Sequence, residues 1–198
     1  TEVDRTQEAF DLLLETLEAV RAATGPEFPV AVKLNSTDKL EGGFTEADAL
    51  EVVRALDGTT VDLIDLSGGT YFPGATPASD SAGRGPYFLR FAGHARRVTT
   101  KPLMLTGGVK SRAHADEILA SGAADIVGLA RALVLEPALP EFWKAADMPE
   151  VAFPRFVETP EGGVTAWYTM RLTALGAGRT AAEFGEMGAA IAAYEARD

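Results

Sequence analysis

Two glycine-containing turns are the clearest chemical feature of this sequence. Residues 103–108 read Leu-Met-Leu-Thr-Gly-Gly, and residues 126–131 read Ile-Val-Gly-Leu-Ala-Arg. Each is an apolar run that breaks into glycine and then into a predicted helix, which gathers backbone N–H groups at two helix N-termini. In a (β/α) barrel, the phosphate of a cofactor commonly lies on the loops after the last two strands. The two turns therefore predict a site for a phosphate-bearing cofactor or substrate.

Both turns also have a simpler explanation. A tight connection between a strand and a helix often needs a positive φ, so Gly107 and Gly108 could serve the turn alone. Arg131 favours the phosphate site, because its planar guanidinium matches phosphate oxygens. The alternative for Arg131 is a surface ion pair with Glu136.

Further candidates lie in or after apolar runs nearer the N-terminus. Lys33 stands inside the run 28–34, which we expect to be buried on both faces, where an unpaired ammonium is costly. A salt bridge to Asp65 inside a barrel is one explanation for Lys33. Ser67 and Gly68 follow the run 61–66, and this glycine either lets the backbone approach a ligand or only releases the strand into the next loop.

The periodicity of apolar residues predicts the elements that position these candidates. Thr45 with Asp48 resembles a capping box, and Ser111 is the expected cap of a later helix. In chain order we expect helix 6–23, strand 28–34, helix 45–56, strand 61–66 and helix 87–98. A third strand that ends in the turn at 103–108, the helix capped by Ser111, a fourth strand that ends in the turn at 126–131 and a short helix past 131 follow. The last two helices are expected near 164–175 and 181–196, and a capping box of Thr180 and Glu183 opens the second of them.

The alternation of strands and helices predicts an α/β fold, with a parallel sheet covered by helices. An open doubly wound sheet and part of a TIM (β/α)8 barrel both fit. The length of each unit, the polar or glycine residues after each strand and the late phosphate turns favour the barrel. A complete barrel needs eight strands and about 250 residues. We therefore expect residues 1–198 to be a single domain, the C-terminal half-barrel of a larger protein with extra C-terminal helices.

The composition argues against several classes of protein. A formal net charge of −11 disfavours binding to nucleic acids and to anionic membranes, which attract clustered Lys and Arg. There is no cysteine, and neither His94 nor His114 has a partner at ligand spacing, so we expect no metal. We see no signal peptide and no run near the ~20 apolar residues of a membrane span, so we expect a cytoplasmic protein.

From about Pro29 to Pro140 the chain resembles the old yellow enzyme family of FMN-dependent NADH:flavin oxidoreductases and ene-reductases. Beyond Pro140, only Trp167 and Tyr168 look familial. Four segments in family order carry the resemblance: 30–35 (Val-Ala-Val-Lys-Leu-Asn), 42–46 (Gly-Gly-Phe-Thr-Glu), 65–71 (Asp-Leu-Ser-Gly-Gly-Thr-Tyr) and 104–131, which opens with Met-Leu-Thr-Gly-Gly-Val and closes with Ile-Val-Gly-Leu-Ala-Arg.

The resemblance implies FMN as cofactor and NADH or NADPH as co-substrate. Lys33 matches the family's basic residue beside flavin N1 and the C2 carbonyl, where it would stabilise the anionic reduced flavin. The family usually has glycine where this chain has Ala130. The cofactor-binding candidates are Lys33, Ser67, Gly68, Gly107 and Gly108 (with backbone N–H groups on the phosphate), Gly128, Ala130 and Arg131 (completing the phosphate site).

The family's substrate-anion pair and proton-donor tyrosine lie in the N-terminal half of the barrel, so no catalytic residue is assigned here. We expect the parent protein to pass hydride from NAD(P)H through FMN to an activated alkene or another small-molecule acceptor, and the isolated chain to be inactive. Two alternatives stay open: a non-catalytic phosphate-binding half-barrel, and a lyase or isomerase barrel using Lys33. We expect the open sheet edges to pair with the N-terminal half or with a second copy of the chain.

Overall fold

The structure is a computed structural model that describes residues 2–68, 85–145, 151–154, 156, 160, 162–179 and 186–197. The chain divides into two compact units, Thr1–Gly128 and Leu129–Asp198, and each is described by itself. The treatment of residues 1–198 as one domain stays a prediction. Within the described ranges, no helix is long and apolar enough to cross a membrane.

Four parallel strands form the sheet of the first unit, in the same order as in the sequence. This is an α/β arrangement of successive strand–helix units, as part of a (β/α)8 barrel has and as the sequence predicted. The elements are α1 (Glu2–Thr24), β1 (Ala31–Asn35), α2 (Glu46–Asp57), β2 (Leu63–Ser67), α3 (Leu89–Ala95), β3 (Leu103–Thr106), α4 (Arg112–Ala120) and β4 (Ile126–Gly128).

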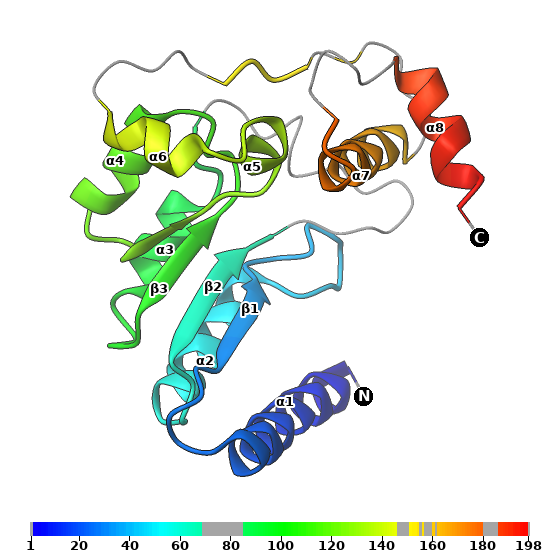
Figure 1. Cartoon of the computed structure of the whole chain (residues 1–198). Helices are drawn as coiled ribbons and strands as arrows, with labels where there is room; N and C mark the ends of the chain where they lie inside the picture. Colours follow the sequence, from blue (N-terminus) through cyan, green and yellow to red (C-terminus); the bar gives the residue numbers. More distant parts are fainter. Residues whose placement is uncertain are drawn as a thin grey trace. The chain divides into compact units, whose positions relative to one another are not determined.

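The core of the first unit lies on one face of this sheet. Ile64, Leu66, Leu103 and Leu105 alternate along β2 and β3, and all four are fully buried. Figure 1 shows α2 and α3 on the same side of the strands. Burial of these side chains against the two helices is the main force that holds the helices to the sheet.

The opposite face carries the polar candidates, and we call it the Lys33 face. Lys33 is in register with Asp65, and Asp65 with Met104. Residues in register on parallel strands point to the same face of the sheet, so these three side chains share a face. The expectation that the Lys33 run is buried on both faces is wrong, since the Lys33 side chain is 60% exposed. The Lys33 face consists of Ala31, Lys33, Asn35, Leu63, Asp65, Ser67, Met104, Thr106, Ile126 and Gly128.

Local hydrogen bonds fix the helix boundaries as the sequence predicted. The Thr45 side chain accepts from Asp48 N–H at 3.2 Å, and the Asp48 carboxylate accepts from Thr45 N–H at 2.9 Å, which completes a capping box. The Ser111 hydroxyl accepts from His114 N–H at the start of α4. These bonds satisfy backbone N–H groups that the first helical turn leaves without a partner.

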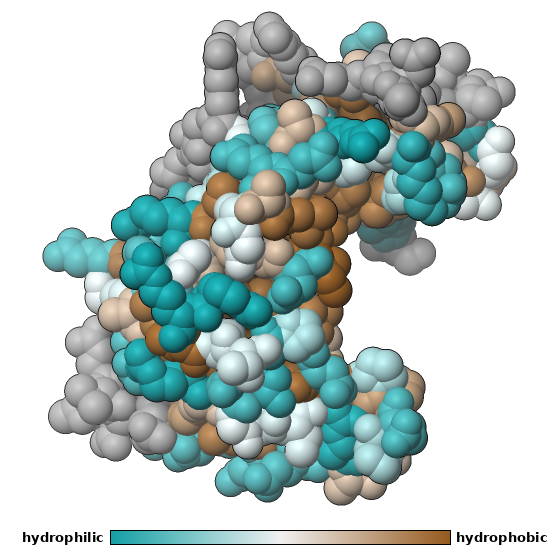
Figure 2. All heavy atoms as spheres, turned by 90° about the vertical axis from the view of Figure 1, so that its left-hand side faces the viewer, coloured by the Kyte–Doolittle hydropathy of each residue, from teal (hydrophilic) through white to brown (hydrophobic). Residues whose placement is uncertain are grey.

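The second unit contains α5 (Arg131–Leu135), α6 (Leu139–Lys144), α7 (Gly163–Gly176) and α8 (Met187–Glu195). Within this unit α7 packs against both α5 and α8. The predicted helices near 164–175 and 181–196 correspond to α7 and α8, and the Thr180–Glu183 capping box lies outside the described residues. The face drawn in Figure 2 shows hydrophilic residues interspersed with hydrophobic ones.

Candidate functional site

The carboxyl ends of β1, β2 and β3 bring several predicted site residues to one edge of the sheet. Because the strands are parallel and adjacent, Ser67 at the end of β2 pairs with Asn35 at the end of β1. Gly107 follows β3 directly, and Lys33 lies two residues before the end of β1. In the first unit, Lys33, Ser67, Gly68, Gly107 and Gly108 therefore occupy the end of the sheet where ligands bind in α/β folds.

The turn after β3 has an unusual backbone. Gly107 and Gly108 have φ values of 131° and 75°, in the region that only glycine adopts readily. A Cβ on Gly107 would lie 2.8 Å from the Phe88 ring, and one on Gly108 would overlap the carbonyl oxygen of Gly85. Both positions therefore require glycine for conformation and for space, which supports the simpler explanation of the pair without excluding the functional one.

The same turn offers hydrogen-bond donors. Among the described residues, the backbone hydrogen bonds outside the helices and strands include none in which Gly107 N–H or Gly108 N–H is the donor. The carbonyl of Gly107, in contrast, accepts from Tyr87 N–H at 3.3 Å. Two successive N–H groups in left-handed glycines form the kind of concave donor set that binds a phosphate oxygen. The turn therefore fits the phosphate group that the sequence predicts.

The Phe88 ring gives a steric reason for glycine at position 68. A Cβ on Gly68 would lie 2.5 Å from Phe88 Cε1, so this glycine makes room for the ring next to the end of β2. Phe88 is buried and also contacts the Gly107 side of the site. Sequence reasoning missed Phe88, because its contact with two glycines that lie 39 residues apart depends on the tertiary fold.

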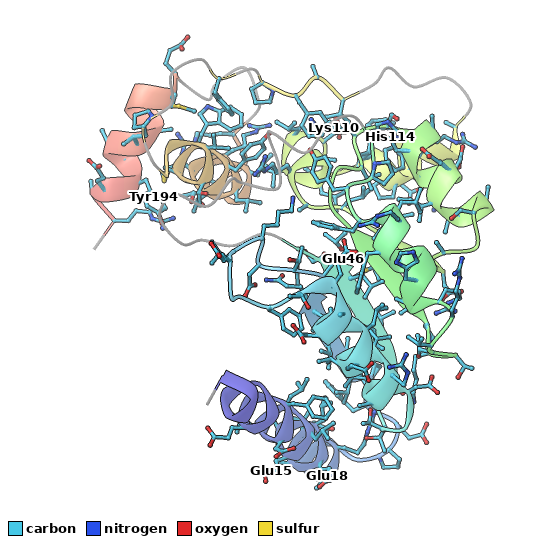
Figure 3. All side chains as sticks on the ribbon, turned by 180° about the vertical axis from the view of Figure 1, so that it is seen from behind. Glu15, Glu18, Glu46, Lys110, His114 and Tyr194 are labelled. Atoms are coloured by element: carbon cyan, nitrogen blue, oxygen red, sulfur yellow. The ribbon has the colours of Figure 1, made fainter. Side chains whose placement is uncertain are left out.

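His114 also contributes to the loop after β3. Its Nδ1 atom accepts from Lys110 N–H at 3.4 Å, and Figure 3 shows both side chains at the start of α4. His114 lies on α4, and the sequence indicated no role for it. Its hydrogen bond fixes the backbone that leads from the Gly107–Gly108 turn into α4.

The Asp65 carboxylate on β2 interacts with Lys33 on β1 and with Thr106 on β3. The Lys33 ammonium lies 3.8 Å from Asp65 Oδ2, so the salt bridge that the sequence offered as one explanation for Lys33 is present. The other carboxylate oxygen, Asp65 Oδ1, accepts from the Thr106 hydroxyl at 2.6 Å. A Cβ on Gly128 would overlap this Thr106 hydroxyl. The phosphate prediction for Gly128 stays a prediction, and the structure adds a steric reason for this glycine.

The remaining candidates belong to the second unit. Ala130 precedes the first residue of α5 and makes no side-chain cap hydrogen bond. Arg131 begins α5, and its guanidinium carbon lies 5.3 Å from the centre of the Tyr168 ring on α7. Glu136, the alternative partner, accepts from Ala138 N–H at 3.1 Å. The cation–π contact between Arg131 and Tyr168 was not anticipated, because it joins helices that lie far apart in the sequence.

Comparison with known proteins supplies independent information. A sequence model of the NADH:flavin oxidoreductase / NADH oxidase family matches residues 7–146. The NADH-dependent flavin oxidoreductase iliE of Neonectria sp. (strain DH2) is 37% identical over 142 residues, which cover 66% of this chain and 18% of that protein.

Solved structures give a similar result. A complex of 2-naphthoyl-CoA reductase with 2-naphthoyl-CoA superposes with a TM-score of 0.60 at 26% identity, covering 67% of this chain and 20% of that one. The old yellow enzyme homologue from Zymomonas mobilis shares the fold, with a TM-score of 0.54, and the match covers 79% of this chain and 43% of that one. The chain thus spans less than half the length of each protein compared.

Proposed function

Because the chain belongs to the NADH:flavin oxidoreductase / NADH oxidase family, we propose that it forms the FMN-phosphate-binding part of an NAD(P)H-dependent flavin oxidoreductase. The observation that carries this proposal is the Gly107–Gly108 turn, where two successive glycines with positive φ follow β3 and, among the described residues, donate no backbone hydrogen bond outside the helices and strands. A phosphate oxygen is the acceptor that such a turn binds best.

Each candidate residue has a definite task in this proposal. Gly107 and Gly108 would donate backbone hydrogen bonds to the phosphate, and Arg131 would add its guanidinium. Lys33 would hold a positive charge beside the flavin ring. Ser67, Gly68, Gly128 and Ala130 are proposed to shape the same site. When bound, FMN supplies the hydride chemistry, with NADH or NADPH as donor and an activated alkene or another small molecule as acceptor.

The whole reaction needs more than these residues. The chain spans 18% of the length of the iliE relative, so the groups that bind and protonate a substrate are proposed to come from elsewhere. We propose that the N-terminal half of the barrel, or a second copy of this chain, completes the site at the open sheet edges. On this proposal the isolated chain binds flavin weakly and does not turn over.

Equilibrium binding of FMN and riboflavin tests the proposal. We expect FMN to bind more tightly than riboflavin, because only FMN carries the phosphate that the Gly107–Gly108 turn recognises. Fluorescence quenching of the flavin measures both affinities, and a Gly108→Ala variant should lose the preference for FMN. Equal affinity for the two flavins would contradict the phosphate site, and no binding of either would favour a non-catalytic half-barrel.

A further inference from the structure

Four residues, one from each strand, form a row across the Lys33 face that steps by two residues between β2 and β3, where Asp65 is in register with Met104. Lys33 lies on β1, Asp65 on β2, Thr106 on β3 and Gly128 on β4. The register aligns Lys33 with Asp65 and Thr106 with Gly128. The link between the two pairs is the hydrogen bond of 2.6 Å from the Thr106 hydroxyl to Asp65 Oδ1.

Asp65 is the buried charged residue of this row. Its side chain is only 10% exposed, whereas that of Lys33 is 60% exposed. A buried carboxylate needs hydrogen bonds to its oxygens, and the Thr106 hydroxyl donates one to Asp65 Oδ1. Lys33 at 3.8 Å is too far for a direct hydrogen bond, so its contribution is electrostatic. Thr106 therefore determines the orientation of the carboxylate, and the second carboxylate oxygen faces the ammonium.

Gly128 leaves the space that Thr106 needs. The backbone of Gly128 does not have a positive φ, so its conformation does not require glycine. A Cβ at this position would overlap the Thr106 hydroxyl oxygen. The glycine of β4 thus permits the rotamer in which Thr106 donates to Asp65.

We propose that Asp65 and Thr106 are positioning residues for Lys33, and that Gly128 maintains their geometry. The row holds the Lys33 ammonium on the face of the sheet before any ligand is present. A lysine side chain has many rotamers, and an electrostatic partner that is already fixed reduces the reorganisation needed when negative charge develops nearby. The choice of a flavin ring as the group that meets Lys33 rests on the proposed function.

A second threonine–aspartate hydrogen bond in the same chain allows a matched test. The Thr99 hydroxyl donates to Asp57 Oδ1 at 2.6 Å, the same distance and chemistry as the Thr106–Asp65 bond, but it joins the segment before β3 to the end of α2. Thr106→Val and Thr99→Val therefore each remove one hydroxyl donor from a carboxylate, although Asp57 keeps the N–H and hydroxyl of Thr100, and only the first substitution acts on Lys33. Thr106→Ser keeps a hydroxyl donor and should restore the wild-type behaviour.

The first readout needs no flavin. The rate at which a limiting amine-acylating reagent modifies Lys33 is measured by peptide mass spectrometry and normalised to Lys144. An exposed ion pair contributes a few tenths to 1 kcal/mol, so we expect Thr106→Val and Gly128→Ala to raise the normalised rate about 1.4- to 5-fold. Thr99→Val and Thr106→Ser should leave it unchanged. An equal rise in Thr99→Val, or no change in Thr106→Val, would overturn the positioning role.

The second readout separates this inference from the proposed function. Flavin affinities are measured for the wild-type chain and for Thr106→Val. The substitution should lower the affinities for FMN and for riboflavin by the same factor, because Lys33 is proposed to face the ring and not the phosphate. If the wild type binds no flavin, the proposed function fails, while the acylation result still decides the role of Thr106. If flavin binds but Thr106→Val weakens only FMN, the row does not act through Lys33 on the ring.

Discussion

Glycine at the ends of these strands serves two physical purposes. Gly107 and Gly108 adopt positive φ values, whereas Gly68 and Gly128 make room for the side chains of Phe88 and Thr106. The sequence indicates only that glycine is present at each position. Which purpose applies depends on the backbone angles of each glycine and on the side chain that the tertiary fold places beside it, and neither is known from the sequence alone.

Arg131 offers a residue-level test of the phosphate site. Arg131→Ala should weaken FMN binding by about 1.5–3 kcal/mol, the usual contribution of a hydrogen bond to a charged group. Riboflavin, which has no phosphate, should bind the variant and the wild type equally. Isothermal titration gives both affinities. Equal losses for the two flavins would mean that Arg131 acts on the ring or only through its contact with Tyr168.

Arg171 is a buried charge of a different kind. It lies on α7 with 3% of its surface exposed, and its Nη1 atom has no hydrogen-bond partner among the described residues. Because an unpaired buried guanidinium is costly, Arg171→Met should stabilise the chain by about 1–3 kcal/mol. Urea unfolding measures this change, and Arg179→Met, at an exposed arginine, is the control. A loss of stability would show that Arg171 has an anionic partner in solution.

At the scale of elements, local signals predicted most of the fold. The Thr45–Asp48 capping box and the Ser111 cap both occur, because each depends on residues within one helical turn. β1 begins at Ala31 rather than at Phe28, whose side chain is 56% exposed. The burial of Lys33 was predicted wrongly, since the pattern of one strand does not say whether anything covers its second face.

Two carboxylates accept hydrogen bonds from other segments of the chain, and their lowered pKa values indicate how stability depends on pH. The hydroxyl of Thr99 and the N–H of Thr100 lower the pKa of Asp57 below its ordinary value of 3.8. The N–H of Val30 and the Arg21 side chain lower the pKa of Asp62 in the same way. A carboxylate with a depressed pKa in the folded state contributes stability above pH 3.8, and this contribution is lost as the pH falls below that value.

We therefore expect acid to destabilise the wild-type chain more than it destabilises Asp57→Asn. The variant should be less stable than the wild type at pH 6, and this difference should shrink at pH 2.5, because protonation of Asp57 reduces its advantage. Urea midpoints at the two pH values measure the difference. Thr16→Val is the control, since this hydroxyl donates to the carbonyl of Leu12 and to no carboxylate. A constant gap between Asp57→Asn and wild type would contradict the prediction.

At the scale of the whole molecule, an incomplete barrel has edges. β1 and β4 stand at the two ends of the strand order, so within the described residues each pairs on one side only. Ile126 on β4 is 44% exposed and lies on the Lys33 face. Unpaired strands with exposed apolar side chains tend to recruit further strands. The parallel order and the strand–helix alternation were predictable from the sequence, but the partner of these edges is not encoded in any local pattern.

We predict that the isolated chain associates through these edges, either with a second copy or with the N-terminal half of the barrel. Light scattering at micromolar concentration should give a mass above the 20.9 kDa of one chain. The formal net charge of −11 repels other copies, so added salt should strengthen self-association by screening this repulsion. A lysine on an edge strand opposes pairing, so Ile126→Lys should lower the mass toward that of the monomer. Leu172 is also an exposed apolar residue but lies on α7, so Leu172→Lys should leave the mass unchanged. A wild-type chain that stays monomeric at high salt and binds no N-terminal half would show that its own residues cover the edges, and the half-barrel interpretation would then be wrong.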